Sequence, residues 1–238
     1  MIRTLGNTRV SSRLLLLGLC VSYALAVRLP LTWGWENGPL EIFQTLTLLA
    51  GLLVALLAAQ AHRPKTASFW WIAALFWLVM LGRELAWGAV FLEPLGMDAE
   101  RGPRYSSSVL MWKPAVAWMC CAMLLLCVFW VMRYRLFHQV LLRCQRENAL
   151  PWGGLLVFVL AMVLSAAAEG HVGKMWWSQL QGVRLTMEEV AECWAYLAVW
   201  WAQWLLVQHM RQWRSGNYLQ TLHFARNSLH ERLERRSV

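Results

Sequence analysis

Six long apolar stretches run through the sequence and limit the folds open to it. A helix needs roughly 20 mainly apolar residues to cross the hydrocarbon core of a bilayer, because it rises about 1.5 Å per residue. Backbone groups in lipid must hydrogen-bond within their own segment, which favours helices over open strands. The sequence therefore predicts an all-α, polytopic membrane helix bundle of about six transmembrane helices. The stretches are Leu14–Leu31, Leu40–Ala61, Ser68–Leu92, Val109–Met132, Trp152–Ala168 and Met187–Val207.

The composition excludes an ordinary soluble domain. Hydrophobic residues make up 59% of the 238 residues, 17 are tryptophan, and the mean hydropathy is +0.43. These values are typical of a multi-pass membrane protein. We expect residues 1–210 to form the transmembrane bundle.

The charges of the links predict the orientation, since short loops rich in Lys and Arg stay in the cytoplasm. Both termini are therefore expected to be cytoplasmic, in a bacterial inner membrane with the acidic links facing the periplasm. This topology accounts for most of the net charge of +9, and no nucleic-acid partner is expected. The basic residues are Arg3, Arg9, Arg13, Arg63, Lys65, Arg133, Arg135, Arg143, Arg146, Arg211, Arg214, Arg226, Arg232, Arg235 and Arg236. The acidic ones are Glu36, Glu93, Asp98, Glu100, Glu169, Glu188 and Glu189.

The two ends of the chain have alternative interpretations. The first stretch, with its basic start and the sequence Ala24-Leu25-Ala26, also fits a cleavable signal peptide, although apolar residues continue to Leu31. Residues 211–238 form a basic cytoplasmic tail with Leu219, Leu222, Ala225, Leu229 and Leu233 at helical spacing. This spacing predicts an amphipathic helix on the anionic inner leaflet or on a partner helix, and a solvated tail is the alternative.

Two adjacent charges, Arg83 and Glu84, interrupt the third stretch in the segment LGRELAWG. A central charge in a membrane helix costs about 2.5 to 3.5 kcal/mol before pairing. Neighbouring residues point about 100° apart on a helix, so each charge needs a different partner. On a helix continuing to Leu92, Glu84 would lie roughly 13 Å inside the outer end and would share a face with Trp87.

Further polar residues fall in the outer third of the other stretches, which predicts one polar site toward the periplasmic side. The candidate catalytic residues are Glu84, Glu192 and His171, and the ligand-binding candidates are Glu41, Gln44, Arg83, Trp87, Lys113 and Glu188. Carboxylates with one histidine fit a divalent-metal site at Glu84, Glu169, His171 and Glu192, or an acid/base pair.

Several of these residues also have a structural interpretation. Thr186-x-x-Glu189 matches a capping box, and carboxylates such as Glu41 and Glu188 are favoured in the first turn of a helix. His171 equally fits a cap at the end of the fifth helix.

Three segments of the sequence resemble a pattern found in uncharacterised bacterial multi-pass membrane proteins. They are ENGPLEIFQ (36–44), GRELAWG (82–88) and EEVAECWAYL (188–197). The resemblance groups Glu41, Gln44, Arg83, Glu84, Trp87, Glu188 and Glu192 in one site, and implies no reaction for it.

Two hypotheses for function follow. In the first, the site binds or processes a membrane lipid or a lipid-linked headgroup from the outer leaflet. In the second, the chain is a non-enzymatic accessory or sensory subunit that assembles with a partner membrane protein. No HExxH or serine nucleophile motif is present, and whether the chain is an enzyme stays open. Transport is disfavoured because the cytoplasmic halves of the stretches are apolar.

Overall fold

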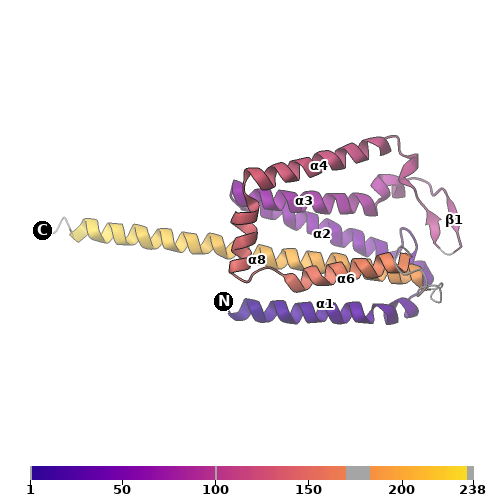
Figure 1. The fold of residues 1–238 in the computed structure, drawn as a ribbon, viewed down its shortest axis with the longest axis horizontal. Helices are drawn as coiled ribbons and strands as arrows, with labels where there is room; N and C mark the ends of the chain where they lie inside the picture. Colours follow the sequence, from indigo (N-terminus) through magenta and orange to yellow (C-terminus); the bar gives the residue numbers. More distant parts are fainter. Residues whose placement is uncertain (1, 100, 170–182, 235–238) are drawn as a thin grey trace.

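The computed structural model describes residues 2–99, 101–169 and 183–234, almost entirely as helices (Figure 1). The long helices are α1 (Ile2–Arg28), α2 (Pro39–Ala61), α3 (Pro64–Glu84), α4 (Lys113–Arg133), α6 (Trp152–Glu169) and α8 (Arg184–Glu234). Shorter helical elements are η1 (Leu31–Gly34), η2 (Ala86–Phe91), η3 (Ser107–Val109), η4 (Phe137–Leu141) and α5 (Leu142–Arg146). Strands β1 (Gly96–Asp98) and β2 (Gly102–Arg104) pair as an antiparallel hairpin.

Within the described residues, five helical segments are long and apolar enough to cross a membrane. This confirms the all-α class and the general prediction of a multi-pass membrane protein. The first predicted stretch is also helical, as part of α1, but it is not among the five. The five segments are Leu31–Ala61, Pro64–Glu84, Lys113–Arg133, Trp152–Glu169 and Arg184–Arg211.

Helix α8 occupies the centre of the bundle, where it packs against α1, α2 and α6. Helix α3 packs on α2, and α4 lies at the edge against α3 (Figure 1). The long helices run in alternating directions, so the α2–α3 link, α5 and the start of α1 share one end of the bundle. The β hairpin, η2 and the start of α8 share the other, which we call the hairpin end.

The core between α2, α3 and α8 contains a buried polar network. The indole Nε1 of Trp77 donates to Oε1 of Gln203 at 2.5 Å, and Nε2 of Gln203 donates to the carbonyl of Gly51 at 2.8 Å. Trp77 is only 1% exposed, and its ring lies directly over Gly51. Because both ends of the Gln203 amide are paired, this polar group is compatible with an apolar core.

The third predicted stretch differs from the structure, because α3 ends at Glu84 rather than at Leu92. The chain then turns through positive φ angles of 44° at Ala86, 57° at Trp87 and 103° at Gly88. Residues in the left-handed conformation often end helices, and glycine adopts this conformation without strain. The carbonyl of Trp87, which lies beyond α3 in a part of η2 with non-helical φ and ψ angles, accepts a hydrogen bond from the indole of Trp112 at 3.2 Å. The prediction that this helix continues to Leu92, with Glu84 about nine residues inside its end, was therefore wrong.

The end of the chain also differs from the expected boundaries. The predicted span Met187–Val207 is part of a single helix, α8, that continues to Glu234 and leaves the bundle (Figure 1). The predicted division at residue 210 therefore falls within a continuous helix. The predicted amphipathic face is formed by side chains of residues 219–233, which are not among the side chains that the structure describes.

Replacing Gly51 with alanine should destabilise the bundle. A Cβ at this position would lie 2.5 Å from the Trp77 ring, whose neighbours hold it in place. We expect Gly51→Ala to lower the free energy of unfolding in detergent micelles by about 1 to 3 kcal/mol, as overpacked cores do. Gly96→Ala is the matched control, since a Cβ there would meet nothing within 4 Å. Equal stability of the two variants would contradict the close contact between α2 and α3.

Candidate functional site

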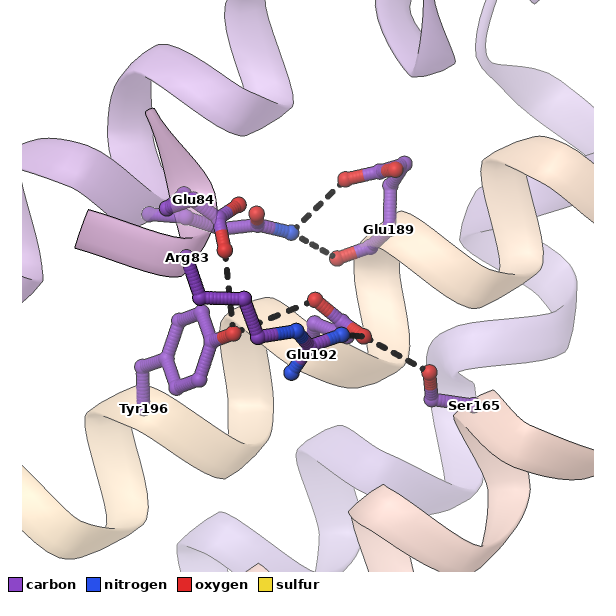
Figure 2. A network of polar contacts seen from close by, with 7 residues as sticks. Arg83, Glu84, Ser165, Glu189, Glu192 and Tyr196 are labelled. Atoms are coloured by element: carbon purple, nitrogen blue, oxygen red, sulfur yellow. Dashed lines mark hydrogen bonds and ion pairs between the residues drawn. The ribbon is translucent and has the colours of Figure 1, made fainter. Parts of the chain in front are cut away.

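Polar side chains from four helices meet toward the hairpin end of the bundle. We call this group the acid cluster. It comprises Gln44 of α2, Arg83 and Glu84 of α3, Ser165 of α6, and Glu189, Glu192 and Tyr196 of α8. Figure 2 shows the labelled members gathered between α3, α6 and α8.

Glu192 is the most connected residue of the acid cluster. Its Oε1 accepts from the hydroxyl of Ser165 at 3.0 Å and from the guanidinium of Arg83 at 3.5 Å (Figure 2). The side chain of Glu192 is 9% exposed, whereas that of Arg83 is 53% exposed. The ion pair therefore joins a buried anion to a cation at the surface of the protein.

Tyr196 connects two carboxyl groups. Its hydroxyl lies 3.1 Å from Oε2 of Glu84 and 3.2 Å from Oε2 of Glu192. A phenol carries a single proton, so it donates to one of these oxygens at a time. The two carboxyl groups thus share one donor.

Gln44 links α2 to the acid cluster through Glu189. Its Nε2 donates to the backbone carbonyl and to Oε2 of Glu189, both at 2.9 Å. The side chain of Gln44 is fully buried, and its Oε1 has no hydrogen-bond partner among the described residues. The amide is therefore satisfied on its donor side only.

The acid cluster contains more anionic groups than cationic ones. Among the described residues, Glu84, Glu189 and Glu192 are accompanied in the cluster by one guanidinium, that of Arg83, which pairs with Glu192. Glu84 and Glu189 also experience electrostatic repulsion from Glu41. Buried charges require compensation, so protons or a bound cation must balance the excess of carboxyl groups.

Four of the residues predicted for the site lie in the acid cluster: Gln44, Arg83, Glu84 and Glu192. Glu41 lies at its edge, where it repels Glu84 and accepts a hydrogen bond from the backbone of Asn37 at the start of α2. This contact fits the helix-start interpretation of Glu41.

Other predicted residues have different surroundings. Lys113 is exposed and bonds to the hydroxyl of Ser107. Trp87 packs its ring over Gly82 instead of sharing a helical face with Glu84. Glu188 is repelled by Glu169 and attracted by Arg101 and Arg184. The predicted site residue His171 lies outside the described residues.

Three members of the acid cluster were not among the predicted site residues. Tyr196 is one helical turn from Glu192, a spacing that places both on one face. Ser165 is a polar residue within the apolar α6, and nothing in its sequence context distinguishes it. Glu189 was assigned to a capping box, but α8 begins at Arg184, which places Thr186 inside the helix.

The proposed metal site receives no support from the geometry of the described residues. Within them, no group of three or more His, Cys, Asp or Glu side chains is arranged to hold a metal ion. The carboxyl groups of Glu84 and Glu192 are instead bonded through Tyr196.

Comparisons of the chain with protein-family models, with curated proteins and with solved structures find no match in any of the three. The interpretation of the site therefore rests on its own chemistry.

Removing the Tyr196 hydroxyl should weaken the acid cluster. In Tyr196→Phe, Glu84 and Glu192 lose their shared donor, and unsatisfied buried acceptors destabilise a fold. We expect the free energy of unfolding in detergent micelles to fall by about 1 to 3 kcal/mol. Tyr23→Phe, at an exposed position on α1, is the matched control and should have no effect. An unchanged stability of Tyr196→Phe would show that the hydroxyl does not hold the cluster together.

Proposed function

We propose that this protein binds the headgroup of a lipid or lipid-linked molecule at the acid cluster, from the periplasmic leaflet of a bacterial inner membrane. The proposal rests on the solvent exposure of the Arg83 side chain. This side chain is 53% exposed, although that of its partner Glu192 is only 9% exposed. A guanidinium has five N–H donors and favours phosphate. Among the described residues the Arg83 guanidinium donates one hydrogen bond, to Glu192, which leaves its other N–H donors for a ligand.

The length of α3 supports a location at headgroup level. Its 21 residues span about 31 Å at about 1.5 Å per residue, which matches a hydrocarbon core of about 30 Å. Arg83 and Glu84 are the last two residues of this helix. The end of the helix therefore favours a site at the membrane surface over one deep in the bilayer.

The proposal includes six spans, with α1 as the first, and both termini in the cytoplasm. The α2–α3 link, which contains Arg63, and α5, which contains Arg143 and Arg146, share an end of the bundle with the start of α1 (Figure 1). The positive-inside rule favours the cytoplasm for this end. The acid cluster would then face the periplasm.

Thiol labelling tests this orientation. Met97 on β1 is exposed at the hairpin end, and Gln145 on α5 is exposed at the other. In intact cells, a membrane-impermeant maleimide should label Met97→Cys above the background of the wild-type protein. Gln145→Cys should react only after the membrane is permeabilised. The reverse pattern would place the acid cluster in the cytoplasmic leaflet.

Substitution of Arg83 tests headgroup binding. Wild-type protein purified gently should carry a lipid in native mass spectrometry, and Arg83→Gln should lose it. A charge-assisted hydrogen bond contributes about 1.5 to 3 kcal/mol, so occupancy should fall about tenfold or more. Arg104→Gln is the control, since it removes the same charge from an exposed position on β2.

Thermal unfolding of the same samples separates binding from folding. Arg83→Gln should lose some stability with the ion pair to Glu192 but stay folded, because Ser165 and Tyr196 still donate to that carboxylate. The proposal fails if wild-type protein carries no specific lipid, or if Arg83→Gln retains it at the wild-type level.

A second candidate function, an accessory subunit with a partner protein, is favoured by α8. This helix has 51 residues, and its C-terminal part extends well beyond the bundle (Figure 1). Isolated helices gain most of their stability from packing, so a helix of this length suits a partner surface or the membrane surface. Truncation after Arg211 should release such a partner in co-purification while leaving lipid occupancy unchanged.

A further inference from the structure

The acid cluster offers more hydrogen-bond acceptors than donors. Ionised carboxylates only accept, and each provides about four acceptor positions. The donors within the cluster are the Gln44 amide, two hydroxyl groups and the Arg83 guanidinium. One of these hydroxyls, that of Tyr196, already serves two carboxyl groups. A ligand that binds among these carboxyl groups in their ionised form must therefore supply N–H or O–H donors.

Gln44 provides an independent indication of the same need. Its Oε1 is buried and has no donor among the described residues. A flipped amide would place Oε1 against the carbonyl and carboxylate oxygens of Glu189, so the two bonds from Nε2 fix the orientation. Buried acceptors in proteins are normally satisfied. The Gln44 amide, whose Nε2 bonds to Glu189 of the acid cluster, therefore keeps one acceptor unused at this position.

The accessible carboxyl groups define where such a donor would bind. Glu84 and Glu189 are partly exposed, whereas Glu192 is buried. Glu84 and Glu189 repel each other electrostatically, so a positive charge close to both carboxyl groups would relieve this repulsion. A primary ammonium carries three N–H donors and one positive charge, which matches both requirements.

Resting on the proposed function, we propose that the bound headgroup carries a primary amine beside its phosphate. The ammonium contacts Glu84, Glu189 and Oε1 of Gln44, while the phosphate contacts Arg83. A phosphoethanolamine-type headgroup has this chemistry, either on a lipid or as a soluble phosphoamine. A quaternary ammonium has the charge but no N–H donor, so it satisfies the site only in part.

Binding of defined probes to the full-length protein tests the inference. The probes are short-chain phosphatidylethanolamine, its N-acetylated derivative, phosphatidylcholine, phosphatidylglycerol and O-phosphoethanolamine, measured by calorimetry in detergent micelles. We expect phosphatidylethanolamine to bind about tenfold or more tightly than its N-acetylated derivative, because charge-assisted hydrogen bonds are lost on acetylation. Phosphatidylcholine and phosphatidylglycerol should also bind more weakly than phosphatidylethanolamine.

Substitutions test which side chains bind the ammonium and which bind the phosphate of the headgroup. The double variant Glu84→Gln/Glu189→Gln should reduce the preference for phosphatidylethanolamine over its N-acetylated derivative to about twofold or less. Arg83→Gln should lower the affinity for these two lipids by the same factor. Glu36→Gln is the matched control and should keep the preference, because Glu36 lies at the same end of the bundle but bonds to the backbone of Tyr105 at 2.7 Å. If the double variant does not fold, the single variant Glu84→Gln is measured instead and should reduce the preference.

The outcomes separate this inference from the proposed function. Phosphatidylethanolamine and its N-acetylated derivative could bind with equal affinity, in both cases dependent on Arg83. This result would overturn the inference of a primary amine but leave the proposal of headgroup binding in place. Absence of binding by every lipid probe would overturn both. Binding of O-phosphoethanolamine as tightly as the lipid would support the amine site and identify a soluble ligand in place of a lipid.

Discussion

The structure depends on the buried carboxylate of Glu192 and the groups that satisfy it. An unpaired charge within a membrane bundle is strongly unfavourable. Ser165 from α6, Arg83 from α3 and Tyr196 from α8 itself therefore have to meet at this carboxylate. Helices α3, α6 and α8 are thus joined at one side chain, which also pairs with Arg83 at the surface.

The apolar stretches, the helical class and the grouping of Gln44, Arg83, Glu84 and Glu192 could be predicted from the sequence. The reasons are general: lipid requires apolar helices, and intramembrane charges require partners. The end of α3 could not be predicted, because Leu85 to Leu92 is as apolar as a continuing helix would be. The break depends on left-handed residues at Ala86 and Trp87 and on a tertiary hydrogen bond from Trp112.

Ser165 and Tyr196 were missed for a related reason. Neither is charged, and a serine or tyrosine in a membrane helix is common enough to need no special partner. Their importance arises from the register of α6 against α8, which places Ser165 beside Glu192. Such a register is decided by packing across the interface, and the periodicity of a single helix does not contain it.

A comparison of two polar networks within the same bundle favours a binding site over a simple packing device. Helices α2, α3 and α8 contribute to both. In the core, Trp77, Gln203 and the carbonyl of Gly51 pair both ends of the amide and carry no charge. At the acid cluster, the same helices leave Oε1 of Gln44 without a donor among the described residues and bring together three carboxyl groups with one guanidinium, which pairs with Glu192. A network that only joins helices gains nothing from such an excess, since unpaired acceptors and like charges oppose folding. The excess is consistent with a cationic ligand that completes the network when it binds.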